Sequence, residues 1–336
     1  MINTTMNDNS IFESTAIRYN KEKNEKKGLK TLGAIGGSAL LLFVAFQILI
    51  GLFLGATHLA KPYFEDSNMT YVLGTLISVF SLGGAFLIAW LFMGKNKRMC
   101  LNLGKPYDTG LMLLAVPAGM LICLLANIVT FYFSEFFEAA FGIIFESPDM
   151  PMPTNAIGII GFILQVAVVP ALIEEFAIRG VIMMPLRKYG DMFAIVTSAA
   201  IFGIMHGNLV QAPFAFIVGI GIGYLVITTG SMWTGVLIHF LNNMFSATIS
   251  LLYEFIPSTY VNIVYYVATA VFFVLGISCW LLFKIRADEK MIPRNLKKST
   301  TELAGTAKFG RYMLNIPMIL ALIYLIYTTS HFISFA

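Results

Sequence analysis

The sequence predicts an all-α protein that forms a polytopic bundle of about nine transmembrane helices. Of its 336 residues, 58% are hydrophobic and only 12% are charged, about half the charged share of a soluble domain. The mean hydropathy is +0.79. Most apolar residues fall into runs of about 20, the length at which a helix crosses a bilayer. These observations exclude an ordinary soluble domain.

Nine apolar segments are expected to span the membrane. The first eight form a core over residues 31–284, and a polar, basic linker at 285–312 separates this core from a ninth helix at 313–336. A short or broken helix is expected near 191–229, because two spans there have only about 18 residues each. The expected spans are 32–59, 70–94, 109–134, 155–186, 191–208, 211–229, 232–254, 260–284 and 313–334.

The distribution of charge predicts which ends of the spans face the cytoplasm. Residues 1–30 are polar and basic, and we expect them to form a mostly flexible cytoplasmic tail. With this tail inside, 20 of the 22 Lys and Arg residues lie on the inner side, and the outer loop 135–154 has four acids and no base. This asymmetry predicts a cytoplasmic N-terminus and an outward C-terminus, in a bacterial plasma membrane. The net charge of +4 therefore reflects topology, and we expect the lipid bilayer but no nucleic acid as a partner.

The cysteines and the glycine pairs are expected to have structural roles and no chemical ones. The three cysteines are far apart and form no CxxC or Cys/His pattern, so neither a disulfide framework nor a structural zinc site is expected. Two glycine pairs at four-residue spacing, Gly51/Gly55 and Gly219/Gly223, predict close helix packing.

Ionisable residues gather between positions 174 and 243, inside otherwise apolar segments. A charged residue at membrane depth costs ~2.5–3.5 kcal/mol on insertion scales, so the default interpretation is function. Glu175 and Arg179 are four residues apart and share a helix face, where we expect them to pair. Glu174 points about 100° away and has no partner in its own helix, which suits it to be a general base. A structural ion pair between helices, the alternative, accounts for Glu175 and Arg179 but not for Glu174.

Two features predict how this helix is placed. Pro170 lies one turn before the glutamates and frees the carbonyl of Val166, so a kink is expected there. Gly190 marks the turn to the next span, with Glu174 16 residues before it and His206 16 residues after it. Antiparallel helices with equal arms put this carboxylate and imidazole at matching depth, about 24 Å along each axis. The two groups are then placed to hold one water between them.

Two pairs at four-residue spacing complete the candidate site. Phe202 shares a helix face with His206, and His239 shares a face of the seventh span with Asn243. An imidazole and an amide together are suitable donors for an oxyanion. The alternative is a hydrogen-bonded contact between helices, which polar residues in bundles often make. His239 is about 12 Å from the inner end of its span, so we expect the site in the inner half of the membrane.

These motifs, in this order on the fourth, fifth and seventh spans, resemble those of the CPBP (Abi) family. Its members are type II CAAX prenyl protease-like and bacteriocin-processing intramembrane proteases. The resemblance covers residues 155–254 and implies an eight-helix protease core, with the linker and ninth helix as an addition. The motifs are Glu174-Glu175-x-x-x-Arg179, Phe202-x-x-x-His206 and His239-x-x-x-Asn243.

The resemblance implies a role for each motif residue. Glu174 and His206 would activate the attacking water, and His239 and Asn243 would stabilise the oxyanion. The family is regarded both as metalloproteases and as metal-free glutamate proteases. If zinc binds, its ligands would be Glu174, His206 and His239, but the sequence has no HExxH motif, and a mechanism without a cofactor is preferred. The supporting residues would be Glu175, Arg179 and Phe202.

The resulting hypothesis is an intramembrane endopeptidase, a hydrolase that cleaves a peptide bond near the cytoplasmic leaflet. Its substrate would be a lipid-modified or amphipathic peptide, or a segment of a membrane protein. One alternative is a proton- or ion-coupled transporter that uses the same residues as a relay, although no clear internal repeat supports it. Another is a catalytically idle immunity or scaffold protein of the same fold.

Overall fold

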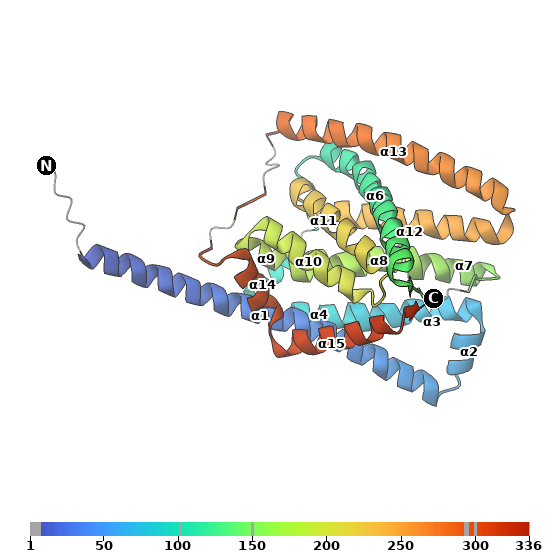
Figure 1. The fold of residues 1–336 in the computed structure, drawn as a ribbon, viewed down its shortest axis with the longest axis horizontal. Helices are drawn as coiled ribbons and strands as arrows, with labels where there is room; N and C mark the ends of the chain where they lie inside the picture. Colours follow the sequence, from blue (N-terminus) through green and yellow to red (C-terminus); the bar gives the residue numbers. More distant parts are fainter. Residues whose placement is uncertain (1–7, 101–102, 149–150, 292–295, 299–300, 336) are drawn as a thin grey trace.

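The computed structural model describes residues 8–100, 103–148, 151–291, 296–298 and 301–335. It confirms the all-α prediction, since the chain is a bundle of long helices (Figure 1). In chain order the helices are α1 (Asp8–Ala56), α2 (Ala60–Glu65), α3 (Ser67–Ser78), α4 (Gly84–Leu91), α5 (Lys97–Cys100), α6 (Thr109–Phe141), α7 (Ala156–Ile163), α8 (Val169–Glu175), α9 (Met184–Leu186), α10 (Asp191–Met205), α11 (Ala212–Thr229), α12 (Met232–Phe255), α13 (Ser258–Glu289), α14 (Gly305–Met313) and α15 (Ile316–Ser330).

Seven helical stretches of the described chain are long and apolar enough to cross a membrane, as befits an integral membrane protein. Two of the nine expected spans are too short or too bent to count as single spans, and the fifth span lies where the sequence predicts a short or broken helix. The fifth, α10, has only 15 residues, because glycines in the left-handed region stand just outside both of its ends, Gly190 (φ 117°) and Gly207 (φ 67°). The ninth is the pair α14 and α15, bent by 83°. The count is therefore seven, or eight if the bent pair is one span.

The N-terminal segment is helical, so the expectation of a mostly flexible tail is wrong for its described part. α1 begins at Asp8 and continues into the first span without a break. Glu22 and Lys26 form an ion pair four residues apart on this helix, and Arg18 pairs with Glu302 at 3.0 Å. Local pairs of this kind stabilise an exposed helix. The first seven residues lie outside the described part of the chain.

The C-terminal helices pack on α1 at a group of glycines. A Cβ atom at Gly37 would collide with the backbone of Met318 in α15, and one at Gly33 would collide with the carbonyl of Tyr312 in α14. Only glycine allows these backbones to approach so closely. Helix also covers both ends of the expected linker 285–312, because α13 extends to Glu289 and α14 begins at Gly305.

A two-stranded sheet joins the C-terminal end of the chain to the loop after α6. β1 (Ile143–Phe145) pairs antiparallel with β2 (Ile333–Phe335), with Ile144 opposite Ser334. The chain end therefore lies beside the end of α6 (Figure 1). The topology predicted from loop charges requires these two segments on the same side of the membrane, and the sheet satisfies that requirement.

The opposite end of α6 is fixed to α13. Asp108 caps α6 by accepting a hydrogen bond from the Leu111 amide, and it pairs with Arg286 near the end of α13. The Arg286 guanidinium, together with that amide, lowers the pKa of Asp108 to about 2. This carboxylate therefore stays ionised, and the pair stays formed, until the pH falls well below the ordinary range of an aspartate.

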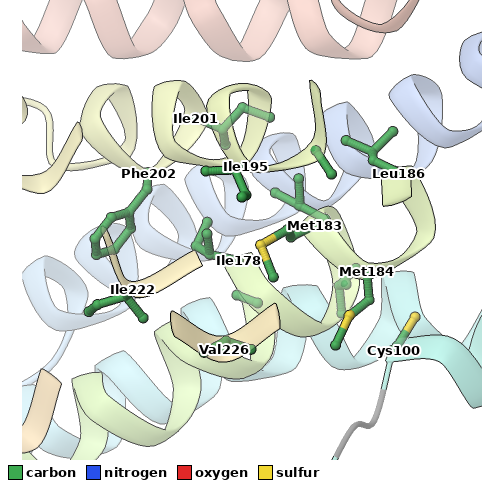
Figure 2. Close-up of a cluster of buried hydrophobic side chains, with 14 of the residues drawn as sticks. Cys100, Ile178, Met183, Met184, Leu186, Ile195, Ile201, Phe202, Ile222 and Val226 are labelled. Atoms are coloured by element: carbon green, nitrogen blue, oxygen red, sulfur yellow. The ribbon is translucent and has the colours of Figure 1, made fainter. Parts of the chain in front are cut away.

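The apolar core lies between the fourth span, α10 and α11. Figure 2 shows Ile178, Ile195 and Ile222, one from each of these elements, within one cluster of buried side chains. The Gly219/Gly223 pair lies against α10, as predicted: a Cβ at Gly219 would be 3.0 Å from Ala199. The prediction for Gly51/Gly55 is wrong, because both positions face open space in the described structure.

Candidate active site

The fourth span is interrupted twice by wider, π-helical turns, at Leu164–Val168 before α8 and at Phe176–Met183 after it. Turns of this kind occur often at functional sites. Pro170 has no N–H with which to bond the carbonyl of Val166, and it lies just after the first of these turns, at the start of α8. The freed carbonyl accepts a hydrogen bond from Asn243 Nδ2 of α12, at 2.9 Å. This bond joins two of the predicted motifs.

Glu175 and Arg179 form the ion pair that their spacing predicts. Arg179 Nη1 lies 2.8 Å from Glu175 Oε1, and both side chains are fully buried. The guanidinium also lies over the ring of Phe202, 5.0 Å from its centroid. Gly235 of α12 presents no side chain to Glu175, and a Cβ there would crowd the carboxylate. A buried charge is costly unless it is paired, and here the guanidinium and the carboxylate neutralise each other.

His239 lies between the two glutamates, a contact that the sequence does not predict. Its Nδ1 is 3.1 Å from Glu175 Oε1, and its Nε2 is 3.8 Å from Glu174 Oε2. Since Glu175 is paired with Arg179, its ionised carboxylate accepts a hydrogen bond from Nδ1–H. Glu175 thereby fixes the orientation of the imidazole as well as that of Arg179.

His206 is at the C-terminal end of α10, where the helix stops. Its Nδ1 lies 2.7 Å from the carbonyl oxygen of Phe202, and its ring packs edge-on against the Phe202 ring. A carbonyl oxygen only accepts hydrogen bonds, so Nδ1 carries the hydrogen. In the neutral ring Nε2 is then the unprotonated nitrogen.

One cavity of about 540 Å³ brings the predicted catalytic residues together. Glu174 reaches it with 18% of its side chain exposed, whereas the neighbouring Glu175 has none. His206, His239 and Asn243 line the same cavity. Its other polar lining residues are Ser78, Asn127, Gln165, Gln211, Asn242, Ser246 and Ser250.

Several polar residues of this cavity are not among the predicted site residues. Gln165 lies in the first π-helical turn, and its Oε1 is buried without a hydrogen-bond partner among the described residues. Asn242 donates to Asn243 Oδ1 at 3.1 Å, and Ser246 follows one turn later on α12. The sequence signal is weak, since an isolated amide or hydroxyl in an apolar span is usually a helix contact.

The residues suggested as zinc ligands do not make a zinc site as they stand. Two imidazoles and a carboxylate are a suitable donor set, and both imidazoles have the second-nitrogen contacts that zinc ligands usually have. In the described part of the chain, however, no three His, Cys, Asp or Glu side chains gather closely enough to hold a metal. We therefore derive no catalytic step that passes through a metal.

Comparison with known proteins supports a peptidase. Residues 156–245, which include every predicted site residue, match a family described as type II CAAX prenyl endopeptidase Rce1-like. The match supports the resemblance of the motifs to the CAAX protease (CPBP) family. A Bacillus subtilis (strain 168) protein named "Putative membrane peptidase YdiL" is 27% identical to this chain over 186 residues, 54% of this chain and 73% of the relative. No solved structure matches the chain significantly.

The region that the family model matches agrees with the 155–254 region of the sequence resemblance. It covers the fourth span, α10, α11 and most of α12. The helices that carry the candidate site are thus those that the family shares. α14 and α15 lie outside the matched region.

Proposed function

We propose that this protein is an intramembrane endopeptidase in which Glu174 and His206 activate a water molecule for attack on a peptide bond. The observation that carries the proposal is the cavity that Glu174, His206, His239 and Asn243 share inside the bundle. A general base must reach the reacting molecule. Glu174 reaches the cavity, and Glu175 is enclosed by Arg179 and His239.

The proposed reaction moves one proton around a closed cycle. Water held between Glu174 and Nε2 of His206 attacks the carbonyl carbon, and one of these groups takes its proton. Nε2 is suited to this because Nδ1 already carries its hydrogen toward Phe202. The proton then passes to the amide nitrogen as the C–N bond breaks. The products are a carboxylic acid and an amine, and the site returns to its starting form.

His239 and Asn243 are proposed to stabilise the negative oxygen that forms during attack. One N–H of the Asn243 amide is used by the Val166 carbonyl, which leaves the second for the substrate. His239 gives its Nδ1–H to Glu175, so its protonated form donates Nε2–H toward the cavity. Donors held in place before the reaction stabilise such charge most effectively.

The proposed substrate is a lipid-modified or amphipathic peptide that enters the cavity in an extended form. An extended chain in lipid needs partners for its backbone N–H and C=O groups. The amide and hydroxyl groups of Gln165, Asn242, Ser246 and Ser250, which line the cavity, supply such partners. The family description, a prenyl endopeptidase, favours a prenylated C-terminal peptide as the first substrate to test.

The test uses purified protein in liposomes with a farnesylated, fluorescence-quenched peptide and the same peptide without the lipid. We expect Glu174→Gln to lower the cleavage rate at least about 100-fold, the contribution typical of general-base catalysis. Glu138→Gln, a neutralised glutamate exposed at the far end of α6, is the matched control and should cleave like wild type.

Three results would contradict parts of this proposal. Equal cleavage by wild type and Glu174→Gln would refute the role of Glu174. Activity lost with a chelator and restored by zinc would replace the metal-free mechanism. Preference for the unlipidated peptide would refute the proposed substrate class, and the peptidase assignment would still stand.

A further inference from the structure

A second cavity, of about 850 Å³, lies between α10 and the C-terminal segment. It is at the end of the bundle where α6 begins and α13 ends, away from β1 and β2. Almost all of its lining is apolar, and the residues come from the start of α10 and from α14. Those that matter here are Met192, Phe193, Val196, Phe309, Met313 and Leu314.

The cavity opens toward the surroundings of the bundle. Met192 and Leu314, both of which line it, are 52% and 71% exposed. α14 has Lys308 and Arg311 among apolar residues and meets α15 at 83°, so it runs across the bundle end. An amphipathic helix in this orientation is suited to the membrane interface. Lys308 fixes α14 there by donating to the carbonyl of Tyr189 at 2.9 Å.

Basic side chains border the cavity, and two of the nearby acids, Asp191 and Glu302, already have partners. Lys297 and Lys298 line it and are exposed, and no ion pair of either side chain occurs within the described residues. Asp191 accepts hydrogen bonds from Arg187 and from the backbone amide of Lys297. Glu302 pairs with Arg18 and Lys21. Glu25, a third acid nearby, accepts a hydrogen bond from the Glu302 amide, and its charge acts on Tyr189 and Lys308. The positive charge at the entrance is therefore that of Lys297 and Lys298, for which the described residues show no ion pair.

We propose that this cavity binds one anionic glycerophospholipid, with an acyl chain inside and the phosphate at Lys297 and Lys298. The apolar lining matches a hydrocarbon chain, and the charge at one end matches a phosphate. A peptide fits poorly, because its backbone needs polar partners and the lining offers few, such as the Thr197 hydroxyl. The bound lipid fills the gap between α10 and α14, so it fastens the C-terminal helices to the bundle.

The test is native mass spectrometry of the purified full chain after incubation with equal amounts of dioleoyl phosphatidylglycerol and dioleoyl phosphatidylcholine. We expect wild type to retain one phosphatidylglycerol in preference to phosphatidylcholine. Lys297→Gln with Lys298→Gln should reduce this preference about tenfold or more, since each lysine near an anionic surface contributes. Val196→Trp should displace the lipid by filling the cavity.

Matched controls separate this site from lipid held generally. Lys23→Gln with Lys30→Gln removes two exposed charges from α1, and Val264→Trp alters an exposed valine of α13. Both should retain lipid like wild type. Equal retention of the two lipids by wild type, unchanged retention in Val196→Trp, or an equal loss in the controls would overturn the proposal. If Val196→Trp fails to fold, as judged by its melting curve, the surface lysine variant decides.

Discussion

At the scale of single residues, Glu174 and Glu175 show how one step along a helix separates two roles. The step turns the side chain by about 100°. Glu175 points into the protein and meets Arg179 and His239, so it is fully buried and held on two sides. Glu174 points into the cavity. In the proposed mechanism the buried glutamate orients its neighbours, and Glu174 meets the substrate.

We predict that Arg179→Ala strongly destabilises the protein. The change leaves the Glu175 charge buried without its cation, which typically costs about 3–5 kcal/mol. The melting temperature in detergent should fall strongly. Glu175→Gln combined with Arg179→Met should recover much of this loss, because no unpaired charge remains, while the glutamine still accepts a hydrogen bond from His239.

The control for this prediction is Lys61→Ala, which removes an ion pair to Glu65 whose side chains are both largely exposed. Exposed pairs contribute little, so its melting curve should match wild type. An Arg179→Ala protein that melts with the wild type would show that the buried pair does not stabilise the fold.

The sequence predicts the local contacts of the candidate site better than the contacts between its helices. Residue spacing alone predicts the Glu175–Arg179 pair, and Pro170 alone predicts a free carbonyl at Val166. The contact of His239 with Glu175 joins helices 64 residues apart in sequence and depends on their rotation and depth. Those are set by packing, including the absence of a side chain at Gly235, and no local pattern reports them.

At the scale of elements, the glycines of α1 decide where the C-terminal helices pack. We predict that Gly37→Val displaces α15, because the added side chain would collide with the backbone of Met318, and backbone has little room to move. Overpacking of this kind typically costs about 1–3 kcal/mol. The measurement is a melting curve together with limited proteolysis of the segment between α13 and α15, which should be cut faster.

α1 also supplies the matched control. Gly51→Val makes the same substitution in the same helix, at a position that faces open space. It should leave both the melting curve and the proteolysis rate unchanged. Equal effects of the two substitutions would mean that helix propensity, and not the contact with α15, accounts for the result.

Long apolar helices are predictable from sequence, and the two short strands and the bend between α14 and α15 are not. β1 and β2 have three residues each, too few for a periodic pattern, and they pair across most of the chain. The bend between α14 and α15 follows from local chemistry, since Asn315 caps α15 by accepting from the Met318 amide. Asn315 is a single polar residue within an apolar run, so a hydropathy profile does not reveal the bend.

At the scale of the whole molecule, the two ends of the bundle differ in the features that they contain. The end with basic residues holds the Asp108–Arg286 pair and the proposed lipid cavity. The other end holds the sheet that joins the C-terminal segment to the loop after α6. The candidate site lies between them, so a substrate that reaches it must enter from within the membrane or from one of these ends.

The predicted orientation of these ends can be tested with single cysteines in a protein whose native cysteines, at positions 100, 123 and 279, are replaced. With 20 of 22 basic residues on the inner side, we expect Lys23→Cys and Lys298→Cys to be cytoplasmic and Ser147→Cys, next to β1, to be outside. A membrane-impermeant maleimide should label Ser147→Cys in intact cells and the other two only after permeabilisation. Labelling of Lys23→Cys in intact cells would invert the topology. Labelling of both Lys23→Cys and Ser147→Cys in intact cells would place the start of α1 and the loop after β1 on the same side of the membrane. The number of spans between them would then be even and not the predicted three.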